Sequence, residues 1–215
     1  VQTAIPGCQP VLTYLVNALS KGDRSTPYSF VTAAGEDFLG HPAGPGELLA
    51  GQWLAEDLNL RPGDSVILSY FVAGPLRTLR TDSARFVVRA IIADKNSPAG
   101  PGLMPQFPGI TGTGSCREWE TGAPIDLKKI RDKDEQYWNE RRGTPKAFIA
   151  LATGQKIWDN PFGHVTAFRF SAPADSIPAM ERRLMKTVQP AWFGLTFRDV
   201  YREGVSAANN GTGFG

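Results

Sequence analysis

The fold of this chain is decided by residues 47–68, which read ELLAGQWLAEDLNLRPGDSVIL. The stretch opens with a short apolar run at 47–50, after which apolar residues recur at helical spacing: Trp53, Leu54, Leu58 and Leu60. Residues 61–64 (RPGD) end this helix, because proline cannot continue a helix and glycine supplies a turn. Runs of β-branched and aromatic residues follow at 65–72 and 84–93 and indicate a long hairpin. The predicted order is therefore strand, helix, hairpin.

On the N-terminal side, two apolar-rich runs at 11–19 and 28–33 flank the turn residues SKGDRS at 20–25. Gly and Asp between β-prone runs predict another hairpin, which is followed by a loop rich in glycine and proline at 35–46.

On the C-terminal side, residues 94–124 have no periodicity and are crowded with proline and glycine, so we expect a long loop that packs down on the protein surface. A charged helix is expected at 125–142, with its alternating charges forming ion pairs on a solvated face. Further predicted elements are strands at 146–153, 165–170 and 191–197, an amphipathic helix at 176–188 and a helix starting at 199. Mixed order and several hairpins predict the α+β class.

Composition excludes several functions. The formal net charge of +2 is too small to indicate nucleic-acid binding, and no run of Lys and Arg forms a phosphate-tracking stripe. No stretch of about eighteen apolar residues is present within these 215 residues. The two cysteines, Cys8 and Cys116, lack metal-ligand spacing, and the sequence leaves open whether they form a disulfide or remain free.

No standard catalytic pattern appears: the chain has neither a Walker A loop, nor a Gly-x-Ser-x-Gly elbow, nor a His-Glu-x-x-His helix. Cys116 and His164 could form a thiol–imidazole pair, but nothing in the sequence brings them together. Glu118 and Glu120 would share a face in a strand, but their segment does not read as one. We therefore expect no enzymatic activity, no cofactor and no metal.

Aromatic residues gather in the middle third of the chain: Trp119, Tyr137, Trp138, Trp158 and Phe162. Two interpretations stand. The cluster could be a satellite core under the long loop, or a contact surface for a partner or ligand.

With these patterns in hand, residues 47–68 resemble the periplasmic domains of FtsX/MacB-type ABC-transporter permeases, in which a strand, a helix, a Gly-Asp turn and a strand follow one another. Residues 85–92 (RFVVRAII) resemble the next strand of that family, and 146–151 the strand after its insertion. Residues 165–170, 176–188 and 193–200 are similar to its closing strand–helix–strand. The segments LMPQFPGI (103–110), PIDL (124–127) and IRDKD (130–134) look like a subgroup of large permeases with a long insertion. The resemblance covers roughly residues 11–210.

The resemblance implies two lobes: a membrane-proximal, porter-like lobe from residues 1–44 and 161–215, and an inserted, β-rich distal lobe from 45–160. It also implies a non-catalytic domain on the periplasmic or extracellular face of the cytoplasmic membrane, which binds a substrate or partner and transmits ATP-driven movement. The implied partners are the permease's own membrane spans, a separate cytoplasmic ATP-binding subunit, a second permease copy or paralogue, and a lipoprotein or periplasmic adaptor. The alternative is a secreted module that binds a carbohydrate or peptide.

Overall fold

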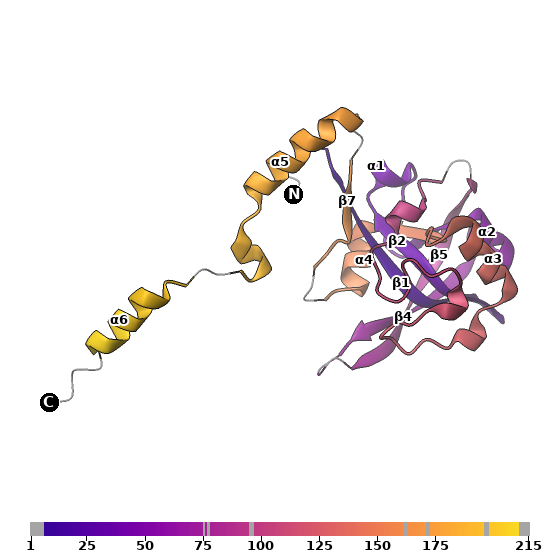
Figure 1. Cartoon of the computed structure of the whole chain (residues 1–215). Helices are drawn as coiled ribbons and strands as arrows, with labels where there is room; N and C mark the ends of the chain where they lie inside the picture. The colour runs from indigo at the N-terminus through magenta and orange to yellow at the C-terminus, as the bar shows by residue number, and fades with distance from the viewer. Residues whose placement is uncertain are drawn as a thin grey trace. The chain divides into compact units, whose positions relative to one another are not determined.

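The structure is a computed structural model that describes residues 7–74, 76, 78–94, 97–160, 163–170, 173–195 and 198–210. It divides into two units, Cys8–Phe170 and the combination of Val1–Gly7 with Ser171–Gly215, and each is described by itself. Helices and strands are both present and mixed along the chain, so the α+β class is confirmed (Figure 1).

The first hairpin is confirmed. Strand β1 (Gln9–Lys21) pairs antiparallel with β2 (Arg24–Ala34), in a register that runs from Val11 opposite Ala34 to Lys21 opposite Arg24. Gly22 forms the turn with a φ of 58°, in the left-handed region that glycine adopts without a steric penalty. A single-turn helix, α1 (Glu36–Leu39), lies within the glycine- and proline-rich loop that follows.

The strand–helix–hairpin order is also confirmed. Strand β3 (Glu47–Gly51) leads directly into α2 (Gln52–Leu58), and then β4 (Ser65–Ala73) pairs antiparallel with β5 (Leu79–Ile92). Helix α2 buries Leu54, Ala55 and Leu58. It ends at Asn59, whose left-handed backbone lets its N–H return to the carbonyl oxygens of the last turn.

Six strands form a closed sheet. Their order is β2-β6-β3-β5-β4-β1, and β1 pairs back to β2, so the ring is complete. The β2–β6 and β3–β5 pairs are parallel and the remaining pairs are antiparallel. The short β6 (Ala147–Ala150) joins the hairpin to β3, while β7 (Ala167–Arg169) pairs only with the start of β1.

The expected division into lobes does not match this arrangement. Strands β1 and β2 come from the segment 1–44 and strands β3 to β6 from 45–160, yet they share one closed sheet. Along the chain, the boundaries between the two compact units fall instead at residues 7/8 and 170/171. Sequence periodicity could not reveal this, because strand pairing between distant segments leaves no local signal.

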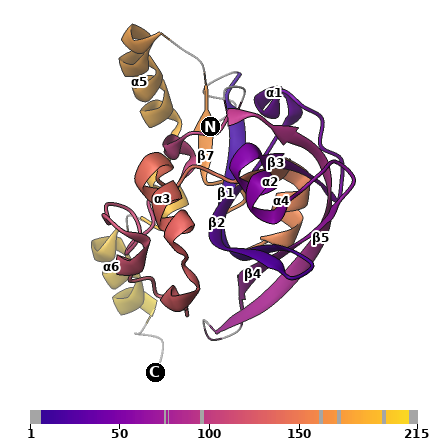
Figure 2. The ribbon, with the colours of Figure 1, turned by 90° about the vertical axis from the view of Figure 1, so that its right-hand side faces the viewer.

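The main core lies inside the closed sheet and includes residues of α2 and α4 (Leu151–Ile157), and in the view of Figure 2 the strands curve around both helices. Its largest buried side chains include Trp158 and Phe86. Gly154 of α4 is required by close packing, because a Cβ there would lie 2.3 Å from the Cβ of Ala33. The segment 146–153 was expected to be one strand. The structure divides it into β6 and the start of α4.

The outer face of the first hairpin is covered as well. Residues 101–142 lie over it and form a satellite core with Phe30 of β2, to which Ile110, Cys116, Trp119, Ile130 and Trp138 contribute. The loop 94–124 thus packs down as expected, with short 3-10 turns at Pro101–Leu103 and Cys116–Glu118. Because both faces of β2 are covered, every residue of its second half is buried.

The expected helix at 125–142 is shorter than predicted. A 3-10 turn occupies Leu127–Lys129, and α3 (Asp132–Arg141) starts only after Arg131. The reason is a capping box, in which the Asp134 carboxylate accepts a hydrogen bond from the backbone N–H of Arg131 at 3.1 Å.

The second unit contains α5 (Ile177–Thr187), as expected from its amphipathic pattern, and α6 (Val200–Asn210), where a helix starting at 199 was expected. A 3-10 turn, Ala174–Ser176, precedes α5. The strand expected at 191–197 is wrong where the structure describes it: Pro190–Phe193 forms a 3-10 turn. Pro190 provides a φ suited to its start, and Gly194 ends it with a φ of 74°.

Candidate functional site

The aromatic residues singled out by the sequence are core residues. Trp119 and Trp138 meet edge to face in the satellite core, with ring centroids 5.1 Å apart. Trp158 lies in the main core and stacks on Tyr14 at 4.9 Å. These three side chains and that of Tyr137 are no more than 6% exposed. They form no contact surface in this structure, which supports the satellite-core interpretation for Trp119 and Trp138; Phe162 lies outside the described residues.

A network of charges around two buried carboxylates lies next to these aromatics and joins the closed sheet to residues 101–142, the covering segment. Arg131 donates to Asp57 of α2 at 2.7 Å and to both carboxylate oxygens of Asp134 at 2.6 and 2.7 Å. Asp57 also accepts from the hydroxyl of Thr26 at 2.5 Å and pairs with Lys133. The Asp57 and Asp134 side chains are only 2% and 6% exposed, so these carboxylates depend on their partners for compensation.

Lys146 extends the network into the satellite core. Its ammonium lies 3.5 Å from Asp134 and over two rings, 4.0 Å from the centroid of Trp53 and 4.7 Å from that of Tyr137. The side chain is 4% exposed. Burial lowers the pKa of Lys146 to about 8, and the neighbouring Asp134 carboxylate opposes this effect. A cation in this position is held by ring faces and one carboxylate instead of by water.

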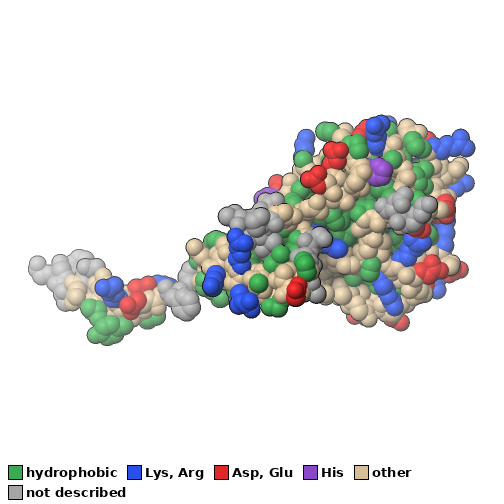
Figure 3. All heavy atoms as spheres, turned by 90° about the horizontal axis from the view of Figure 1, so that it is seen from above, with side chains coloured by type: hydrophobic (Ala, Val, Ile, Leu, Met, Phe, Trp, Pro, Cys, Tyr) green, Lys and Arg blue, Asp and Glu red, His purple; other side chains and the backbone are tan. Residues whose placement is uncertain are grey.

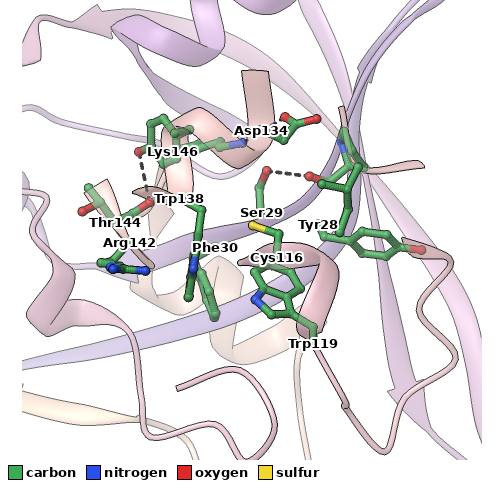
Figure 4. Close-up of a pocket in the computed structure, with 13 residues that line it drawn as sticks. Tyr28, Ser29, Phe30, Cys116, Trp119, Asp134, Trp138, Arg142, Thr144 and Lys146 are labelled. Atoms are coloured by element: carbon green, nitrogen blue, oxygen red, sulfur yellow. Dashed lines mark hydrogen bonds and ion pairs between the residues drawn. The ribbon is translucent and has the colours of Figure 1, made fainter. Parts of the chain in front are cut away.

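A small cavity is enclosed between these groups. Figure 4 shows Cys116, Trp119 and Trp138 around it together with Lys146, and its volume is about 20 Å³. That volume admits nothing larger than one water molecule. The charge network therefore links the first hairpin to the covering segment through polar contacts. The cavity beside it is too small to hold a substrate.

The catalytic pairs considered from the sequence are not assembled. Burial, reinforced by the Glu135 carboxylate, raises the pKa of Cys116 to about 12, so the thiol is protonated at neutral pH and is a poor nucleophile. His164 is exposed, and its imidazole lies 3.8 Å from the Asp159 carboxylate. Glu118 and Glu120 are both exposed. Both cysteines are free and buried.

The charge network was not predicted from the sequence. The charges of residues 128–135 were expected to lie on a solvated face, whereas Asp134 is buried and Arg131 bridges two buried carboxylates. The spacing of Arg131 and Asp134, three residues apart, was the one available signal. Asp57, 74 residues away from Arg131, gave none.

A larger hollow lies elsewhere on the same unit, beside β1. One part has a volume of about 370 Å³ and is lined mainly by apolar side chains, and a second part of about 580 Å³ is lined by polar and apolar side chains together, including Asp126 and Lys129. The two parts share the lining residues Asn17, Tyr28 and Phe71, so they adjoin, and together they are the groove beside β1. The first part has the size and composition typical of small-molecule sites.

Other features bear on function. In the described part of the chain, no three His, Cys, Asp or Glu side chains cluster as metal ligands would. None of the helices described there is both long and apolar enough to cross a bilayer. On the face shown in Figure 3, basic and acidic side chains are interspersed.

Comparison with protein-family models gives no match, and comparison with curated proteins gives none either.

Proposed function

We propose that this chain is the extracytoplasmic domain of an FtsX/MacB-like ABC-transporter permease, and that it binds a partner or substrate and transmits movement without catalysing a reaction. One observation carries the proposal: the polypeptide enters and leaves the Cys8–Phe170 unit at the same place. Gln9 lies opposite Arg169 and Val11 opposite Ala167 in the antiparallel pairing of β1 with β7. A domain inserted between two membrane spans needs its two connections side by side.

The strand–helix–hairpin at residues 47–92 gives further support. These residues build β3, α2, β4 and β5 in the order that the family resemblance requires. In this proposal residues 171–215 belong to the membrane-proximal lobe and lead back to the bilayer.

The closed sheet suits a force-transmitting role. A ring of six hydrogen-bonded strands has no open edge along which it can widen easily, so a pull on β1 and β7 moves the unit as one body. In the proposed cycle a cytoplasmic ATP-binding subunit hydrolyses ATP and displaces the spans, and the outer domains of two permease copies or paralogues move against each other. Such a cycle requires two packed arrangements of similar free energy. A lipoprotein or periplasmic adaptor is the proposed outer partner.

The test uses the parent reading frame, in which we expect an apolar span on each side of these residues and an ATP-binding subunit that co-purifies with the protein. The location is tested with Asn139→Cys, which places a thiol at an exposed position of α3, whereas both native thiols are buried. A membrane-impermeant maleimide should label this variant in intact cells and leave the unsubstituted protein unlabelled. Labelling that appears only after lysis, or flanking sequence without spans, would refute the proposal.

A second candidate is a secreted ligand-binding module, and the groove beside β1 is the observation that favours it. The aromatic side chains that would form its contact surface include Trp119, Trp138 and Trp158. These three are buried and cannot contact a ligand in this conformation. Secretion of the parent protein without flanking spans would favour this candidate over the permease.

A further inference from the structure

The groove beside β1 has a floor and two walls that come from distant parts of the chain. Its floor is β1, with Tyr14, Leu15 and Asn17 among the lining residues, and one wall is the β4–β5 hairpin. The other wall is the covering segment, which contributes Pro105, Phe107, Ala123 and Ile125. Seven of the residues that line this apolar part are large hydrophobic or aromatic ones: Tyr14, Leu15, Tyr28, Phe71, Leu79, Phe107 and Ile125.

Both walls are held in position by hydrogen bonds. The Tyr14 hydroxyl donates to the carbonyl oxygen of Phe71 at 2.7 Å and fixes the hairpin wall to the floor. The backbone N–H of Asp126 donates to the Tyr28 hydroxyl at 2.7 Å and fixes the covering segment to β2. The groove is therefore preformed, so a ligand would not have to supply the free energy of ordering it.

Tyr28 stands where the apolar and polar parts meet. Its φ of 34° is positive, which is uncommon for a residue other than glycine and strains the backbone. Residues held in such conformations gather at ligand clamps and active sites, where the surrounding structure maintains them. This conformation lies between the Val16–Ser29 and Ala18–Pro27 pairs of the first hairpin, at a residue that lines both parts of the groove.

The polar part carries charges of both signs. Asp126 and Lys129 are exposed residues that line it. Arg131 lines it too, but its charge is already compensated by the buried carboxylates of Asp57 and Asp134. With one exposed acid and one exposed base, this end favours a polar head without net charge over an anion or a cation.

We propose that the groove binds a single-chain amphiphile, with the hydrocarbon chain against the apolar part and a polar, net-neutral head beyond Tyr28. The amphipathy of the groove sets this class, because a purely polar ligand would leave the apolar part in water and a purely apolar one would bury the polar end unpaired. The inference is independent of the permease proposal, since it concerns binding by the isolated chain and not its cellular location.

The experiment titrates the 215-residue chain with dodecylphosphocholine monomer, below its micelle-forming concentration, by isothermal titration calorimetry. Saturable binding with one site is expected. Each buried methylene contributes about fourfold in affinity, which corresponds to about 0.8 kcal/mol, so decylphosphocholine should bind about 15-fold more weakly.

Ala123→Trp fills the groove from its wall and should abolish binding, whereas Asn139→Trp adds the same side chain at an exposed position outside it. Leu79 is 42% exposed, so Leu79→Gln should fold normally and weaken binding by about tenfold through loss of apolar contact. Thermal unfolding of each variant checks that the fold is intact.

Three results would overturn the inference: the absence of saturable binding, equal affinity for both chain lengths, or unchanged binding by the folded Ala123→Trp and Leu79→Gln variants. Self-association of the native chain that Ala123→Trp abolishes would also overturn it, because the groove would then hold a second copy. None of these results bears on the maleimide labelling, so the two proposals fail separately.

Discussion

The substitution Lys146→Met tests the cost of keeping an ammonium in the satellite core. Methionine is close in length to lysine, is apolar, and suits the space between the Trp53 and Tyr137 rings. The substitution does not strand Asp134, because Arg131 still donates to both oxygens of that carboxylate. The variant therefore removes a buried charge without leaving another unpaired.

The magnitude follows from the pKa. Burial lowers the pKa of Lys146 from its ordinary 10.5 to about 8, and one pKa unit corresponds to about 1.4 kcal/mol. At pH 7 the ammonium therefore costs the folded state up to about 3 kcal/mol, and we expect Lys146→Met to be more stable than the native chain by up to that amount. Between pH 8 and 10.5 the unfolded chain keeps this proton and the folded chain does not, so native stability rises with pH and the gain of the variant disappears.

The assay is urea unfolding followed by tryptophan fluorescence at each pH unit from 7 to 10, always as a difference between variant and native chain. The difference is needed because other groups titrate in the opposite sense. The pKa of Cys116 is raised to about 12 by burial, so above pH 9 the folded chain keeps a proton that the unfolded chain loses, and its stability falls. Burial also raises the pKa of Tyr137, which adds to this loss above pH 10.

The control is Lys156→Met, which removes an exposed lysine from α4 and should show no pH-dependent difference. A stability gain of Lys146→Met that is the same at pH 7 and pH 10 would refute the reasoning, because Lys146 would then not change protonation within that range in the folded state.

Three further predictions concern stability and reactivity. Arg131→Met should destabilise the chain by about 1–3 kcal/mol in urea unfolding, since Asp134 and Asp57 each lose a donor while Asp57 keeps Lys133 and Thr26. Arg131→Lys should recover part of this, and an equal loss in both variants would argue against a charge effect. Gly154→Ala should lower the free energy of unfolding by about 1–3 kcal/mol, although alanine favours helices, because the added Cβ meets that of Ala33. Gly204→Ala is the matched control: there is open space around Gly204, so this variant should raise the helix content measured by circular dichroism. The two buried cysteines should react with a thiol reagent only as fast as the fold opens, and rapid reaction in the native state would contradict their burial.

Much of the secondary structure could be predicted locally. The turn at Gly22, the helix stop at 61–64 and the apolar spacing of α5 are short-range patterns, and all three correspond to elements in the structure. The errors came where a local pattern is ambiguous. Residues 147–152 are all apolar, which suits a buried strand and a buried helix equally. The structure has a helix from Leu151, and Gly154 of that helix packs closely against Ala33.

The sequence by itself therefore determined the two hairpins, the strand–helix–hairpin order and the α+β class, because each depends on contacts between residues close along the chain. Only the tertiary structure decided the closure of the sheet, the side-by-side entry and exit at Gln9 and Arg169, the groove beside β1 and the buried charges around Lys146. These features join residues that lie tens to more than a hundred positions apart. They are stabilised by strand pairing and by the removal of side chains from water, which depend on residues that meet only in the folded chain. The periodicity and composition of the sequence carry no information about such contacts.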